Sequence, residues 1–178
     1  MDVIVTASTG TSSALILPIS FIFWCYVAAY TVHILEEAVL GETFVAKVKG
    51  RVWPGYNWRK FFGFNTLLMS LNIIAIILYE IFGGAWIVFP LSLAFERIFN
   101  GFWHLGETIV TRKFSSGLLS SILFWILGYF IVRYSFLKGE IPVPFFIISM
   151  TMGLILTCLM FGSLMAFKKK YMPESNSH

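Results

Sequence analysis

Three ionisable residues stand together in an apolar stretch near the start of the chain: His33, Glu36 and Glu37. On a helix, both glutamates lie about one turn from the histidine, so all three side chains can point into one cavity. Ionisable groups in membrane-embedded helices are costly, and they mark functional sites by default. The spacing therefore predicts a site in which these three side chains act together.

A second polar group follows in a later apolar stretch and contains Glu96, Arg97, Asn100, His104 and Glu107. At about 100° per residue, these residues fall within roughly 100° of the helix circumference and form one polar stripe. Glu96 and Glu107 lie about three turns, or roughly 16 Å, apart, so they cannot share one metal ion. We expect Glu96, Arg97 and Asn100 to support the site or contact a substrate, with Glu96 in an ion pair with Arg97 or another helix.

Both groups contain the pattern His-x-x-Glu, His33 with Glu36 and His104 with Glu107. In reversed order, these pairs resemble the Glu-x-x-His pairs that hold di-iron sites in helical bundles. Imidazole and carboxylate ligands together suit Zn²⁺, Fe²⁺ or Mn²⁺. The sequence predicts one or two bound ions, zinc or iron. Glu37 and Glu107 are also predicted to be catalytic. The five predicted ligands are His33, Glu36, Glu37, His104 and Glu107.

The composition indicates that most of the chain is surrounded by lipid. Of its 178 residues, 58% are hydrophobic, 18% aromatic and only 12% charged. A soluble domain usually carries about twice that charged fraction, so the polar residues are too few to cover a water-facing surface. The composition excludes a soluble nucleic-acid binder and predicts an integral membrane protein, by default in the plasma membrane.

Five segments are long and apolar enough to cross a bilayer, which needs roughly 20 residues of helix. They cover about 14–40, 61–82, 85–110, 118–134 and 143–167, and a basic and polar tail follows at 168–178. Turn-forming residues separate them at 50–55, 83–84, 115–117 and 139–144. The predicted fold is all-α, a polytopic transmembrane helix bundle of about five spans in a single domain.

The basic residues predict the orientation of the bundle. They gather after the first and third segments and in the tail: Lys47, Lys49, Arg51, Arg59, Lys60, Arg112, Lys113, Lys168, Lys169 and Lys170. Positive charges favour the cytoplasmic side, so we expect the N-terminus outside and the C-terminus inside. The first and third spans then run in the same direction. His33 and His104 lie about seven and six residues before their inner ends, so the two should sit at nearly the same depth.

The stretch His33-Ile34-Leu35-Glu36-Glu37, the later His104 and the tetrapeptide Phe114-Ser115-Ser116-Gly117 resemble the HXXEE domain family. That family is described by the HXXEE motif, a further histidine and a Tyr-x-Pro-Gly motif, and the resemblance covers roughly residues 27–128. In this chain, phenylalanine and serine replace the tyrosine and the proline of the last motif. The family is functionally uncharacterised, so the resemblance implies no reaction. It implies an integral membrane protein with a candidate site at His33, Glu36, Glu37 and His104.

Three functions fit these observations. The first is a metal-dependent enzyme acting on a lipid-like or isoprenoid substrate, by hydrolysis with zinc or by oxidation with iron. The second is a carrier that moves protons or metal ions along the carboxylates. The third is a non-catalytic membrane partner or immunity-type protein, in which the polar side chains form a structural network between helices.

Overall fold

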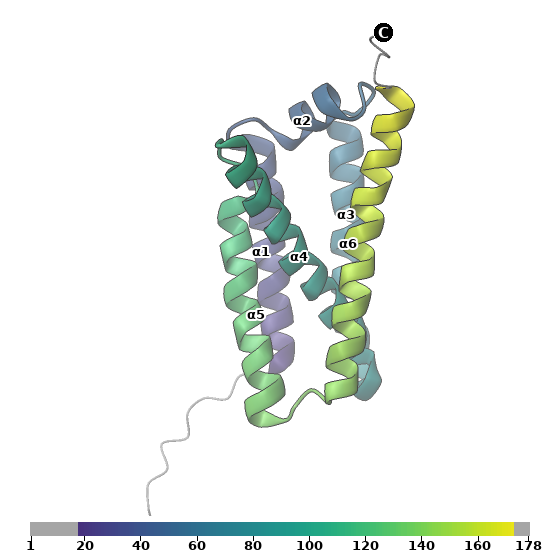
Figure 1. Ribbon diagram of the computed structural model, residues 1–178. Helices are drawn as coiled ribbons and strands as arrows, with labels where there is room; N and C mark the ends of the chain where they lie inside the picture. The colour runs from purple at the N-terminus through teal and green to yellow at the C-terminus, as the bar shows by residue number, and fades with distance from the viewer. Residues whose placement is uncertain (1–17, 173–178) are drawn as a thin grey trace, which may run out of the picture.

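The computed structural model describes residues 18–172, and all regular structure in this part of the chain is helical. The elements are α1 (Ile19–Val39), α2 (Phe44–Arg51), α3 (Trp58–Phe82), the short 3₁₀ helix η1 (Gly84–Ile87), α4 (Val88–Thr111), α5 (Leu118–Lys138) and α6 (Val143–Tyr171). The long helices run roughly along one direction, α4 crosses the bundle obliquely, and α2 lies across one end (Figure 1). The predicted all-α class is confirmed.

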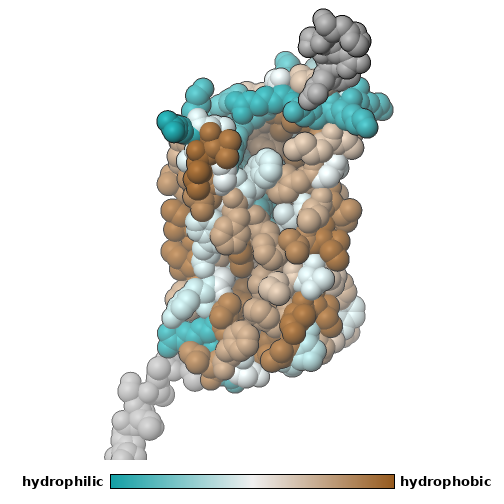
Figure 2. Space-filling view, in the orientation of Figure 1, coloured by the Kyte–Doolittle hydropathy of each residue, from teal (hydrophilic) through white to brown (hydrophobic). Residues whose placement is uncertain are grey.

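Four of the helices, α1, α3, α5 and α6, are long and apolar enough to cross a membrane. On the face seen in Figure 2, the middle of the bundle is largely apolar and hydrophilic residues gather at the end where α2 lies. These features support contact with a lipid bilayer. The fifth span, the orientation and the identity of the membrane remain predictions.

Helix α4 differs from the others because its charged residues lower its hydropathy. It nevertheless lies in the centre of the bundle, packed against both α5 and α6. Its contact with α6 depends on Gly153, where an added Cβ would lie 2.6 Å from Cβ of Phe95 and 2.8 Å from the carbonyl oxygen of Ser92. Small residues at such crossings let helix backbones approach closely in a membrane. The polar stripe of α4 is therefore enclosed by neighbouring helices.

The helix boundaries differ from the predicted ones for local reasons. Helix α3 begins at Trp58, before the expected 61, because the side chain of Asn57 accepts a hydrogen bond from the backbone N–H of Lys60 at 3.1 Å. Helix α5 runs past the expected 134 to Lys138 and ends at Gly139, whose φ of +64° suits a glycine at a helix C-terminus.

The structure also changes the boundaries of the predicted tail and of the third predicted span. Helix α6 continues to Tyr171, so the three lysines at 168–170 lie in its last turn instead of in a separate tail. The third predicted span begins as the 3₁₀ helix η1 before it becomes α4. Positions 14–17 of the first predicted span and 173–178 of the predicted tail lie outside the described residues.

Helix α2 was not predicted, since only a turn-rich connection was expected after the first span. Thr43 caps it by accepting from the backbone N–H of Ala46 at 3.3 Å. Its buried side, which includes Val45, Lys47 and Val48, faces the bundle. A short amphipathic helix in a basic connection gives a weak sequence signal, because its apolar face is only a few residues long.

Candidate metal centre

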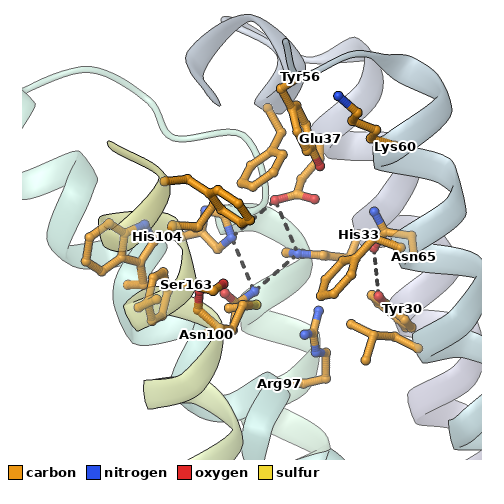
Figure 3. Close-up of a pocket in the computed structure, with 18 of the residues that line it drawn as sticks. Tyr30, His33, Glu37, Tyr56, Lys60, Asn65, Arg97, Asn100, His104 and Ser163 are labelled. Carbon is orange, nitrogen blue, oxygen red and sulfur yellow. Dashed lines mark hydrogen bonds and ion pairs between the residues drawn. The ribbon is translucent and has the colours of Figure 1, made fainter. Parts of the chain in front are cut away.

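His33 of α1 and His104 of α4 meet inside the bundle, as their equal depth predicted. Their ring centroids are 5.2 Å apart, and only 1% and 3% of their surfaces are exposed. Glu37, one turn beyond His33, places Oε1 3.7 Å from Nε2 of His33 and 3.6 Å from Nε2 of His104 (Figure 3). One ligand atom from each of the three residues lies within 4.8 Å of the others, so the group could hold a metal ion.

Asn100, one turn before His104 on α4, closes this group in the structure. Its Nδ2 lies 3.4 Å from Nε2 of His33 and 3.4 Å from Nε2 of His104. An amide N–H can donate only to a nitrogen that carries a lone pair, so this position is consistent with a lone pair on Nε2 of each histidine. The predicted supporting position of Asn100 is therefore next to both histidines.

Glu36 lies on the opposite side of the His33 ring from Glu37. Nδ1 of His33 is 2.8 Å from Oγ of Ser120, and that hydroxyl donates to Oε2 of Glu36 at 2.5 Å. The same carboxylate accepts from the backbone N–H groups of Leu119 and Ser120 at 3.0 and 2.7 Å. It therefore satisfies free N–H groups at the start of α5 and lies outside the group of three, although the sequence predicted it as a ligand.

Glu107 is placed in the same way relative to His104. Nδ1 of His104 is 3.0 Å from Oγ of Ser115, and that hydroxyl donates to Glu107. Lys47 of α2 completes the arrangement, with Nζ 2.9 Å from Oε2 of Glu107 and 3.2 Å from Oγ of Ser115. Glu107, also a predicted ligand, therefore reaches His104 only through a serine.

These two His–Ser–Glu chains indicate the tautomers of both histidines. The shortest contact of each serine hydroxyl is to a carboxylate, closer for Ser120 than the carbonyl oxygen of Gly117 at 3.1 Å, so the hydroxyl donates to the carboxylate and accepts the hydrogen of the neighbouring Nδ1. A neutral histidine protonated at Nδ1 has a lone pair at Nε2. The Nε2 lone pairs of His33 and His104 therefore both face Oε1 of Glu37.

Gly117, in the connection between α4 and α5, lies against both rings. Its φ of +103° is a conformation that favours glycine. An added Cβ would be 2.6 Å from Cε1 of His104 and 2.8 Å from Cε1 of His33. The sequence identified Ser115-Ser116-Gly117 as a break between spans and as part of the last motif of the family resemblance, and in the structure Ser115 and Gly117 of this segment contact the two histidines.

The comparison with protein-family models decides the family. Residues 24–132, well over half of the chain, match a model described as a protein of unknown function with an HXXEE motif. The chain belongs to this HXXEE family. The comparisons with curated proteins and with solved structures give no match.

This HXXEE protein departs from the family's last motif at Phe114, which lies outside the group of His33, Glu37 and His104. The phenylalanine that stands for the tyrosine, Phe114, is 45% exposed, and an added Cβ at Gly41 would be 3.9 Å from its ring. The side chain thus lies at the surface near Gly41 and is not part of the cavity lining. A tyrosine hydroxyl is not required for the contacts described here, which use Ser115, Gly117 and Ser120.

In the HXXEE protein, His33, Glu37 and His104 line a cavity of about 310 Å³. Most of its other walls are apolar or aromatic and come from α2, α3, α4, α6 and the connection after α2, among them Phe44, Trp53, Phe64, Leu68, Trp103, Met160, Phe161, Leu164 and Phe167. Binding sites for small molecules are typically such largely apolar cavities with a few convergent polar groups.

Further polar side chains line this cavity, among them Arg97 at one end and Tyr56 at the other (Figure 3). Arg97, which lines it, donates from Nε and Nη2 to the adjacent Glu96, so the predicted ion pair is present. The guanidinium carbon lies 4.6 Å from the ring centroid of Tyr30, whose hydroxyl donates to Asn65 at 2.7 Å. At the other end, burial raises the pKa of the Tyr56 phenol, so this side chain is neutral at physiological pH.

Proposed function

We propose that this protein is a membrane metalloenzyme with a single divalent ion, zinc or iron, bound by His33, Glu37 and His104, and that it acts on a lipid-like substrate in the adjoining cavity. One observation carries the proposal: two imidazole lone pairs and a carboxylate oxygen converge on one point in the cavity wall. Within residues 18–172, Nε2 of each histidine has Nδ2 of Asn100 at 3.4 Å and Oε1 of Glu37 at 3.7 or 3.6 Å as polar neighbours, and a bound ion would replace these long contacts with metal–ligand bonds.

The distances support an ion of zinc or iron size. With metal–ligand bonds of about 2.0–2.2 Å, two ligands of a tetrahedral ion are roughly 3.3 Å apart. The separations between Glu37 and the two Nε2 atoms, 3.7 and 3.6 Å, need only a small contraction to reach this value. Two histidines with one carboxylate form a common donor set of catalytic zinc and of non-haem iron.

Three protein ligands leave at least one position for water or substrate, as in catalytic sites and unlike closed structural ones. When bound, the ion would lower the pKa of a coordinated water and polarise a substrate oxygen, or activate dioxygen in the case of iron. Glu37 could move a proton with its second carboxylate oxygen. Glu36 and Glu107 accept hydrogen bonds from Ser120 and Ser115, and these serines contact Nδ1 of the two histidines. Because neither carboxylate reaches the Nε2 side of the rings, the arrangement favours one ion over two.

Metal analysis of the protein purified in detergent tests the proposal. The wild type should hold about one zinc or iron per chain, and Glu37→Gln should weaken binding by more than the 10–100-fold typical of outer-sphere changes. Glu80→Gln is a matched control on α3, where the carboxylate accepts from Nε1 of Trp24 at 3.0 Å on the bundle surface. An undiminished metal content in Glu37→Gln, or none in the wild type, would leave the buried group as a structural network and refute the enzyme.

A further inference from the structure

The cavity beside the candidate metal centre is bordered by two helices that are not packed along each other. Helix α3 packs against α1 and α4, and α6 packs against α4, yet both contribute to the cavity lining. Leu68 of α3 and Leu164 of α6 are only partly buried, and Phe64 is 46% exposed. In a bilayer, this side of the cavity therefore opens onto lipid chains and not onto water.

The opening lies near the end of the bundle where α2 and the basic ends of α3 and α6 gather. Lys60 lines the cavity and stands 3.9 Å from the ring centroid of Trp53. Trp53 in turn stacks on Phe167 with ring centroids 4.8 Å apart, next to the lysines at 168–170. Aromatic and basic side chains of this kind occupy the level of lipid head groups. The opening thus connects the cavity to one leaflet, the one on the α2 side.

Arg97 marks the deeper end of the same cavity. Its side chain points toward the space beside His33 and Asn100 (Figure 3). Glu96 accepts from Nε and Nη2, and no hydrogen bond from the second terminal nitrogen, Nη1, is found within residues 18–172, so Nη1 could donate to a group inside the cavity. Arginine is the preferred side chain for binding carboxylate and phosphate oxygens.

The charges in the cavity wall suit an anion. The charged side chains that line the cavity are Glu37, Lys60 and Arg97, so cations outnumber anions in the lining itself. An anionic head group inside the cavity would therefore lie among cationic side chains and a bound divalent ion.

We infer that the cavity binds a single-chain amphiphile with a carboxylate or phosphate head, which lies between the metal centre and Arg97 while its apolar chain passes out between α3 and α6. This inference rests on the proposed function and adds the substrate class to it. A cavity of about 310 Å³ is at the small end for ligand sites, so it suits one head group and the first part of one chain.

Photo-crosslinking in detergent micelles tests the position of the chain. The probe is dodecanoate with a photoactivatable group at its apolar end, and labelled residues are mapped by mass spectrometry. Labels should concentrate on α3 around Leu68 and on α6 around Leu164, and Leu164→Trp should reduce them severalfold. Ile155→Trp is the control, because Ile155 is on the same helix, 52% exposed and outside the cavity. Labels spread evenly over the apolar surface, equal in both variants, would overturn the inference.

Competition tests the head group. Dodecyl phosphate and unlabelled dodecanoate should displace the probe, and whichever acts at lower concentration identifies the natural head, whereas dodecanol should be at least tenfold weaker. The paired variant Glu96→Gln with Arg97→Gln removes both charges together, so it leaves no lone buried ion, and it should abolish the preference for the anions. Equal competition by the alcohol in the wild type would refute the anionic head.

Metal content measured on the same samples separates this inference from the proposed function. Stoichiometric metal with labels away from α3 and α6 would refute the ligand assignment alone. Absent metal with cavity labelling that still discriminates anions would refute the enzyme and support an anion-binding site based on Arg97.

Discussion

Gly117→Ala should damage the metal centre without touching any proposed ligand. The new Cβ would lie 2.6 Å from Cε1 of His104 and 2.8 Å from Cε1 of His33. Side-chain carbons do not approach this closely, so the rings or the 115–117 segment must move. Since the same segment also supplies Ser115 to the His104 chain, the displacement would disturb the orientation of the ring as well as its position.

Two contributions set the size of the effect. Placing alanine at φ +103° costs about 1–3 kcal/mol of folding free energy, whatever the surroundings. Disturbing the supports of metal-binding histidines typically weakens metal affinity by about 10–100-fold, which corresponds to about 1.4–2.8 kcal/mol of binding free energy. The variant should therefore lose both stability and metal.

Gly139→Ala separates the two contributions. Gly139 also has a positive φ, +64°, but nothing lies within 4 Å of an added Cβ. This variant should lose about 1–2 kcal/mol of stability and keep the metal affinity of the wild type. Thermal unfolding in detergent and titration with Zn²⁺ measure the two quantities. A Gly117→Ala protein that binds zinc as tightly as Gly139→Ala would refute the role given to the 115–117 segment.

Three more predictions concern the supports of the site and the bundle. Ser120→Ala should weaken zinc binding about 10–100-fold and cost about 1–3 kcal/mol of stability, because buried Nδ1 of His33 and Oε2 of Glu36 lose their shared partner; unchanged affinity in the zinc titration would contradict the tautomer argument. Gly153→Ala should cost about 1–3 kcal/mol because its Cβ meets α4 backbone atoms, whereas Gly162→Ala, with open space around it, should be neutral in the same unfolding assay. Lys47→Met should cost about 2 kcal/mol by removing the charged hydrogen bond to Glu107; an unchanged midpoint would show that the partly exposed pair is screened by solvent.

The meeting of His33 and His104 was predictable because helix rise and the distribution of basic residues place two residues at a common depth before any contact is known. Burial of the polar stripe of α4 was predictable for a similar reason, since charged residues in a membrane-embedded helix must face other protein groups.

The choice between Glu36 and Glu37 was not predictable. Both lie about one turn from His33, and which of them faces the second histidine depends on the rotation of α1 about its own axis. That rotation is set by packing against α5, whose first N–H groups bind Glu36. Ser115 and Ser120 were missed because serines near a break between helices usually indicate only a turn or a cap.

The orientation of both imidazoles depends on the connection after α4 and on the first turn of α5, which come after both histidines in the chain. Ser115, Gly117 and Ser120 orient or contact rings from α1 and α4, so neither ring has its final setting until the start of α5 has joined the bundle. During biosynthesis, helices α1 to α4 would emerge with the proposed metal ligands already made but not yet oriented. Loading with metal would therefore be a late step in assembly, and a chain cut before residue 115 should lack the site although it contains every proposed ligand.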